Sequence, residues 1–222
     1  MDLKLRGQRF LISGGSRGIG LEISKKLLEE GCFVTILARN ESNLKKVTLN
    51  LGRKYGRTKI SSFSVDCSSS QDLIRLKNSI SRKNFNGLIL NVGDGDGLPD
   101  PIPPEEIRQK TWSQNFIPAL NVAEIFLNKL SKKNASILFI SSIAGKEVIG
   151  APTDYSVAKA AINMFAKNLS KKLAPKVRVN SIAPGNIYFK GGTWDKKLDS
   201  NPNKVKRMLQ NNVPLQRFGT PS

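Results

Sequence analysis

A tyrosine and a lysine stand four positions apart, at Tyr155 and Lys159, in a stretch that we predict to be helical. Side chains at that spacing share one face of a helix, so the phenol and the amine would lie side by side. A phenol with its ordinary pKa of about 10 is a poor acid or base at neutral pH. A nearby ammonium favours the phenolate and lowers that pKa. The pair therefore predicts general acid/base chemistry by Tyr155, tuned by Lys159.

Several other kinds of chemistry are excluded by composition. The 222 residues contain no histidine, which rules out a Ser-His-Asp triad and a zinc site with histidine ligands. Two cysteines, Cys32 and Cys67, cannot form a disulfide framework, and we expect buried thiols at both positions. The aspartates of segment 94–100 lack the glutamate spacing of a calcium loop, so we expect a surface turn and no metal site.

A glycine-rich segment follows the first apolar run and leads into a helical stretch. Glycines let the backbone turn sharply and approach a pyrophosphate, and the start of a helix offers free N–H groups and a positive dipole end. An ordinary glycine turn is the alternative, but strand, glycines and helix occurring together favour phosphate binding. The segment reads Ser13-Gly14-Gly15-Ser16-Arg17-Gly18-Ile19-Gly20.

The end of the second apolar run favours NADP(H) over NAD(H). NAD-type folds place a carboxylate on the adenosine ribose about 20 residues after the glycine loop. Here Arg39 occupies that region, and no carboxylate occurs until Glu41. The Arg39 guanidinium can pair with a 2′-phosphate, and Arg17 could approach from the other side. The alternative is that both arginines are solvated charges of a basic protein.

Short apolar runs alternate with helix-length stretches along the whole chain. Parallel strands need connections of a dozen residues or more, so this order predicts an α/β fold with a doubly wound, mostly parallel, Rossmann-like sheet covered on both faces. We expect one domain over residues 1–222, with an irregular arm over 185–203, a helix near 204–212 and a substrate loop over 186–212. The six expected strands are Phe10–Ser13, Cys32–Ala38, Ile60–Val65, Gly87–Val92, Ser136–Ile140 and Val177–Ile182.

The glycine spacing Gly14-x-x-x-Gly18-x-Gly20 resembles that of the short-chain dehydrogenase/reductase family in its compact single-domain form. The resemblance extends from Gly7 to Pro221 and includes a match to the family's catalytic tetrad: Asn115, Ser142, Tyr155 and Lys159. Asn91-Val92-Gly93 matches the family's Asn-Ala-Gly element except that Val92 stands in place of the alanine. The cofactor-binding residues that the loop and the resemblance imply are Gly14, Ser16, Arg17, Gly18, Ile19, Gly20, Arg39, Asp66, Asn91, Gly93, Tyr155, Lys159, Pro184, Gly185 and Ile187.

By this resemblance, Ser142 holds the substrate oxygen while Tyr155 supplies its proton, and Lys159 also bonds the nicotinamide ribose. Asn115 would keep a water in a relay behind Lys159, although it could instead hydrogen-bond within its own helix. Ser141 is a second hydroxyl beside Ser142, and the resemblance favours Ser142. In the arm, Trp194 could close over substrate, whereas we expect Trp112 to serve in helix packing.

The charge is strongly positive, with 36 Lys plus Arg against 17 Asp plus Glu, or +19. The basic residues lie in pairs such as Lys25-Lys26 rather than in one tract with interleaved aromatics, which indicates solvated helix faces more than a nucleic-acid site. No apolar run is long enough for a signal peptide or a membrane span, so we expect no membrane partner and a cytoplasmic location. Relatives continue beyond a segment like 217–221 into a further helix and strand. If the chain naturally ends at Ser222, the sixth strand is expected at an exposed edge, and a homo-oligomer, usual for the family, would lose a frequent contact; a truncated fragment is the alternative.

The leading hypothesis is an NADP(H)-dependent oxidoreductase that interconverts a ketone and a secondary alcohol, with a small carbonyl compound or alcohol as substrate. The second is a dinucleotide-binding protein of the same fold that turns over poorly and has a binding or regulatory role. The third, nucleic-acid binding, predicts a steep dependence on salt.

Overall fold

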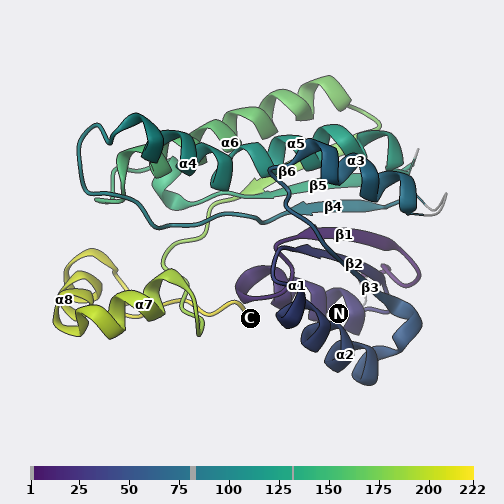
Figure 1. Cartoon of the computed structure of the whole chain (residues 1–222), viewed down its shortest axis with the longest axis horizontal. Coiled ribbons are helices and arrows are strands. Elements are labelled where there is room, and N and C mark those ends of the chain that lie inside the picture. Colours follow the sequence, from purple (N-terminus) through teal and green to yellow (C-terminus); the bar gives the residue numbers. More distant parts are fainter. Residues whose placement is uncertain (1–2, 81–83, 132) are drawn as a thin grey trace.

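The computed structural model describes residues 3–80, 84–131 and 133–222. Six strands form one parallel sheet in the order β3-β2-β1-β4-β5-β6 (Figure 1), so the order reverses between β1 and β4. The predicted strands and the doubly wound fold are confirmed, with ends that differ by no more than two residues. The strands are β1 (Arg9–Ser13), β2 (Phe33–Ala38), β3 (Ile60–Ser64), β4 (Gly87–Leu90), β5 (Ala135–Ile140) and β6 (Val177–Ile182).

Helices cover the sheet in two layers. In Figure 1, α1 and α2 lie on one side of the strands, and α3, α4, α5 and α6 lie on the other. None of the helices in the described segments is both long enough and apolar enough to cross a membrane. Their bounds are α1 (Gly18–Glu29), α2 (Glu41–Tyr55), α3 (Ser70–Ser79), α4 (Glu105–Asn115), α5 (Ile117–Phe126), α6 (Thr153–Leu173), α7 (Thr193–Ser200) and α8 (Pro202–Asn212).

The apolar strands contribute side chains to two separate cores, because successive side chains point to opposite faces of a sheet. Leu11 of β1 packs with Leu88 in the core beneath α3, α5 and α6. Its neighbour Ile12 packs with Ile36 and Ile89 in the core beneath α1 and α2. Each such side chain contributes about 1.5–3 kcal/mol when fully buried, which fixes the register of the central strands.

The edge strand β6 is covered less completely than the rest of the sheet. This strand forms one edge of the sheet, and Val179 points into the core against α6. Arg178 and Asn180 are exposed, and Ile182 is 50% exposed. In the described part of the chain, α6 is the helix that packs closely on β6, so the strand's other face meets solvent.

The arm after β6 contains two helices rather than one. The predicted helix near 204–212 is α8, which Asn201 caps by accepting from the Lys204 N–H. The helix α7 was missed because its short sequence is rich in Lys and Asp and follows two glycines. Neither helix contributes much core: α7 has no buried residue, and Val205 is the buried residue of α8. In Figure 1 this pair stands apart from the sheet.

Candidate active site

A cavity of about 810 Å³ lies at the carboxyl ends of the strands and extends to the arm. This is where doubly wound sheets bind ligands, at the point where strand order reverses. Gly18, Gly20 and Asn115 are not among the residues that line the cavity. The remaining predicted site residues line it: Gly14, Ser16, Arg17, Ile19, Arg39, Asp66, Asn91, Gly93, Ser142, Tyr155, Lys159, Pro184, Gly185 and Ile187.

The glycine loop between β1 and α1 needs its glycines for physical reasons. Gly14 has φ of +70°, a conformation that side chains rarely adopt. A Cβ at Gly20 would lie 2.3 Å from the Gly14 carbonyl oxygen. Asn91 donates from Nδ2 to that same oxygen at 3.0 Å and so clamps the loop to β4. Helix α1 begins without a side-chain cap, which leaves its first N–H groups for a phosphate. The loop therefore fits a dinucleotide.

The outer end of the cavity carries two of the predicted cofactor-binding residues. Arg39 and Asp66 both line it. The Asp66 carboxylate accepts from the backbone N–H and the hydroxyl of Ser68, at 2.9 and 2.8 Å, which fixes its orientation. Arg17 lines the cavity, as predicted for a cofactor-binding residue, and its guanidinium also donates to the Gly191 carbonyl oxygen of the arm at 3.1 Å. Among the contacts of the described residues, Arg17 thus joins the glycine loop to the arm.

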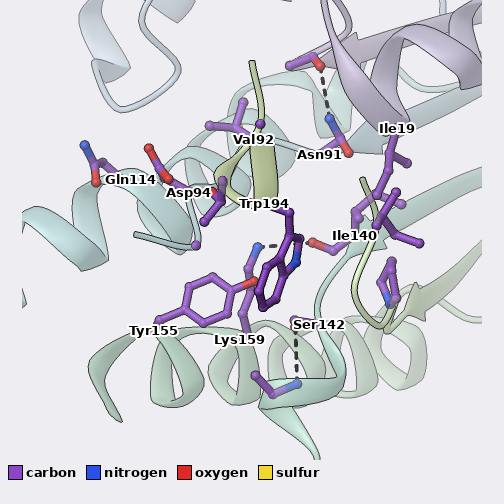
Figure 2. A pocket seen from close by; sticks show the side chains of 18 of the residues that line it. Ile19, Asn91, Val92, Asp94, Gln114, Ile140, Ser142, Tyr155, Lys159 and Trp194 are labelled. Carbon is purple, nitrogen blue, oxygen red and sulfur yellow. Dashed lines mark hydrogen bonds between the residues drawn. The ribbon is translucent and has the colours of Figure 1, made fainter. Parts of the chain in front are cut away.

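The inner end of the cavity brings together Tyr155, Lys159 and Ser142. Figure 2 shows Tyr155 and Lys159 rising from α6 on one face, with Ser142 close by. Lys159 is 4% exposed, donates from Nζ to the Ile140 carbonyl oxygen at 3.4 Å, and lies 5.7 Å from the centre of the Tyr155 ring. The Ser142 Oγ accepts from the Ala144 N–H, which leaves its hydrogen free to donate toward Tyr155.

Burial dominates the pKa values of both groups on α6. It raises the pKa of the Tyr155 phenol; a hydrogen bond from Ser142 lowers that pKa, and the charge of Asp94 raises it again. Burial also lowers the pKa of the Lys159 ammonium to about 8. The expectation that Lys159 gives Tyr155 a lowered pKa is therefore wrong in this structure, because the cost of burying the phenolate exceeds the help from its neighbours.

Hydrogen bonds bear on two alternatives to the predicted tetrad: Ser141 in place of Ser142, and a role for Asn115 within its own helix. Ser141 is 5% exposed, and its hydroxyl donates to the Lys159 carbonyl oxygen at 2.9 Å, which ties β5 to α6. Asn115 is fully buried at the end of α4. Its Nδ2 donates to the Thr111 carbonyl oxygen at 3.1 Å, as the helix alternative predicted, and its Oδ1 accepts from the Asp94 N–H at 3.0 Å.

Gly93 allows the inner end of the cavity to be compact. A Cβ at this position would lie 2.7 Å from the Lys159 Nζ and 3.1 Å from the Asn115 Oδ1. A larger residue here would displace the Lys159 ammonium from its position. The adjoining segment forms the expected surface turn: residues 96–100 are exposed, and the Asp94 carboxylate accepts from the Asp96 N–H. The described residues contain no cluster of side chains suited to a metal ion.

The arm adds aromatic residues that sequence reasoning missed or left open. The Phe189 ring packs on the glycine loop, where a Cβ at Gly18 would lie 2.7 Å from it. No motif marks Phe189, because the contact depends on the path of the arm. Trp194 lines the cavity, and its ring packs on Phe218 with centroids 5.3 Å apart; that it closes over substrate stays a prediction. Trp112 packs edge-on against Phe116, as expected.

Comparison with known proteins gives the same picture. The sequence model of the family described as short chain dehydrogenase matches residues 8–197. A 3-oxoacyl-[acyl-carrier-protein] reductase of Chlamydia muridarum is 33% identical over 227 residues, covering 100% of this chain and 88% of the relative. L-Sorbose reductase from Gluconobacter frateurii, solved with NADPH and L-sorbose, has a TM-score of 0.90 at 25% identity, covering 100% of this chain and 88% of that one.

A third similar protein carries the other nicotinamide cofactor. The 3-oxoacyl-[acyl-carrier protein] reductase from Brucella melitensis, solved with bound NAD, has a TM-score of 0.81 at 24% identity, covering 97% of this chain and 80% of that one. The same fold therefore accommodates either cofactor. The family model spans most of the chain, and the Chlamydia muridarum relative is 33% identical over an alignment that covers 100% of this chain. The protein therefore belongs to the short-chain dehydrogenase/reductase family of oxidoreductases.

Proposed function

We propose that the protein is an NADPH-dependent reductase that interconverts a ketone and a secondary alcohol, with Tyr155 as the general acid. The observation that carries the proposal is the meeting of Tyr155, Lys159 and Ser142 at the inner end of a cavity whose outer end is a glycine loop suited to a pyrophosphate. One continuous cavity thus supplies both a dinucleotide site and a proton donor.

The cofactor, when bound, supplies a hydride to the carbonyl carbon of the substrate. In this proposal the hydroxyls of Ser142 and Tyr155 hold the substrate oxygen. Because burial raises the pKa of Tyr155, the phenol stays protonated at neutral pH and is ready to give its proton to that oxygen. The pKa of Lys159 near 8 leaves its amine mostly protonated at neutral pH. A positive charge there stabilises the phenolate that proton transfer leaves behind.

Two observations support NADPH as the cofactor. Arg39 lines the outer end of the cavity, where a guanidinium can pair with the 2′-phosphate that NADPH carries and NADH lacks. The segment from Ala38 to Asn40 contains no carboxylate to bind a free ribose hydroxyl. The NADPH-bound L-sorbose reductase gives further support, and the NAD-bound relative makes this preference a matter for direct measurement.

The test is turnover by wild-type protein and by Tyr155→Phe, with NADPH oxidation followed over a panel of ketones. The names of the relatives suggest 3-oxoacyl thioesters and ketoses for this panel. We expect Tyr155→Phe to lower kcat by about a hundredfold or more, since it removes the proton donor, with little change in NADPH affinity. Tyr55→Phe is the matched control, because the Tyr55 hydroxyl contacts the exposed Glu29 far from the cavity.

Equal turnover by Tyr155→Phe and wild type would exclude the proposed role of the phenol. NADPH binding without turnover of any ketone would favour instead the dinucleotide-binding protein with a regulatory role. Tight binding to DNA or RNA that weakens steeply with salt would favour the nucleic-acid hypothesis. The cytoplasmic location and the oligomeric state expected from the sequence stay predictions.

A further inference from the structure

A chain of hydrogen bonds leads from the loop after β4, through α4, to the start of α6. The Asp94 N–H donates to the Asn115 Oδ1, and the Asn115 Nδ2 donates to the Thr111 carbonyl oxygen. The Thr111 hydroxyl then donates to the Asp154 Oδ2. The other Asp154 oxygen, Oδ1, accepts from the Tyr155 N–H at 3.0 Å. The chain thus ends on the backbone of the tyrosine at the centre of the site.

The link between Thr111 and Asp154 is buried. Thr111 is 3% exposed and Asp154 is 6% exposed. An aspartate buried to this degree is uncommon unless its oxygens have donors. Here two donors come from two different helices, one from the side chain of Thr111 on α4 and one from the backbone of α6. The carboxylate therefore fixes the distance between these helices at the turn that carries Tyr155.

The carboxylate also suits the local structure of α6. The helix begins at Thr153 after Pro152, and no side chain caps its first N–H groups from the position before the helix. Asp154 lies in the first turn, where a negative charge is favoured by the helix dipole and where an oxygen can accept a free N–H. A capping aspartate explains the bond to Tyr155. It does not require the second bond to Thr111.

We propose that Thr111 and Asp154 form a positioning pair, which sets the direction of the Tyr155 side chain relative to Ser142 and the loop at Gly93. This inference rests on the proposed function. Neither residue lines the cavity, so neither touches the substrate. They act through the backbone of the first turn of α6, where a shift of the phenol by a fraction of an ångström would weaken its contact with Ser142 and with a substrate oxygen.

Thr111→Val tests the pair because it removes the hydroxyl at nearly constant volume. We expect kcat for ketone reduction to fall by about tenfold, with KM and NADPH affinity within about twofold, since only the alignment of the proton donor changes. Thr111→Ser keeps a hydroxyl and should restore most of kcat. If valine is not accommodated, Thr111→Ala removes the same hydroxyl without a steric demand.

The matched control is Thr48→Val. The Thr48 hydroxyl also joins two elements, since it donates to the Leu44 carbonyl oxygen of α2 and is paired at 2.8 Å with the Ser62 hydroxyl of β3, but it lies outside the cavity. We expect Thr48→Val to lower the unfolding temperature less than Thr111→Val does, because Thr48 is half-buried and its loss deprives no buried carboxylate of a donor, and to leave kcat unchanged. A kcat for Thr111→Val that equals the Thr48→Val value would overturn the positioning proposal.

A second readout needs no substrate. The absorbance titration of tyrosine, taken by rapid pH jump as wild type minus Tyr155→Phe, gives the titration midpoint of Tyr155. Loss of the Ser142 contact should raise this midpoint in Thr111→Val, but not in Thr111→Ser or Thr48→Val, when each variant is measured against its own Tyr155→Phe double variant. A midpoint that is unchanged or lower would also overturn the positioning proposal. If wild type reduces no ketone, the proposed function fails on its own, and this titration still decides whether the pair positions Tyr155.

Discussion

The glycine-loop half of the cavity, from β1 to β4, and the arm from Asn186 to Asn212 bound the same space with very different amounts of packing. Behind the glycine loop stand two apolar cores and fully buried residues such as Leu11 and Ile12. The arm buries Val205. It is held in place by the bond from Arg17 to Gly191, by the Phe189 ring on Gly18, and by the ion pair of Lys196 with Asp96.

This difference separates two tasks. The half that we assign to the cofactor is rigid because its backbone geometry is set by the sheet and by contacts that tolerate no extra atom. The arm has few buried contacts, and segments of that kind open at low cost in free energy. We therefore expect changes in the glycine-loop half to act on binding and folding together, and changes in the arm to act on rates of ligand exchange with little effect on folding.

The largest effect is expected from Gly20→Ala. The added Cβ would lie 2.3 Å from the Gly14 carbonyl oxygen and 2.6 Å from the Asn91 Nδ2, and a backbone atom cannot easily move away. We expect NADPH affinity to fall by about a hundredfold or more. Gly52→Ala in α2 is the control, since its Cβ would meet its neighbours at ordinary distances of 3.5 Å and beyond. Fluorescence titration measures the NADPH affinity of both variants. Equal affinities would show that the close contacts at Gly20 do not matter for binding.

A smaller effect is expected from Phe189→Ala, which removes the ring that packs the arm onto the glycine loop. The arm should open more often, so NADPH should dissociate about tenfold faster in stopped-flow fluorescence while the unfolding temperature changes little. Leu215→Ala, at a side chain that is 73% exposed in the same part of the chain, is the control. A large loss of global stability in Phe189→Ala, with unchanged release, would contradict the contrast between the two regions.

The smallest effect concerns the buried ammonium of Lys159. Its pKa is about 8 in the folded protein and 10.5 ordinarily, so between these values the unfolded chain holds more protons and stability rises with pH. Burial raises the pKa of Cys32 to about 11 and that of Cys67 to about 12, from 9, which lowers stability above pH 9. From pH 8 to 9, wild type should therefore gain about 1 kcal/mol in unfolding free energy relative to Lys159→Met. Urea unfolding at each pH measures the unfolding free energy of both proteins. If the values for wild type and Lys159→Met changed with pH in parallel, the Lys159 ammonium would not be buried.

The same contrast explains what could be predicted from sequence. Strand positions and the glycine loop were predictable because nearly continuous apolar runs and a fixed order of glycines reflect local requirements. The pairing of Tyr155 with Lys159 followed from helical spacing alone. Helix α7 and the ring of Phe189 were not predictable, because their contacts depend on the path of an arm with little core.

Within the site, the missed features are those that depend on burial and long-range pairing. The spacing of Tyr155 and Lys159 indicates proximity but not desolvation, so it predicted the wrong direction for the phenol pKa. The bond between Thr111 and Asp154 joins residues 43 positions apart, and no local pattern marks it. Likewise, Arg17 was expected near a phosphate, and its contact with Gly191 became evident only from the folded chain.

The most direct test of the account is thermal unfolding of the protein with NADPH, with NADH and without ligand. A ligand at 100 times its dissociation constant adds about 2.7 kcal/mol to the stability of a folded site. We predict one cooperative transition that NADPH raises clearly and that NADH at the same concentration raises much less, with the difference lost in Arg39→Ala. Equal shifts with both cofactors would contradict the assignment of Arg39 to the 2′-phosphate, and no shift with either would contradict the dinucleotide site itself.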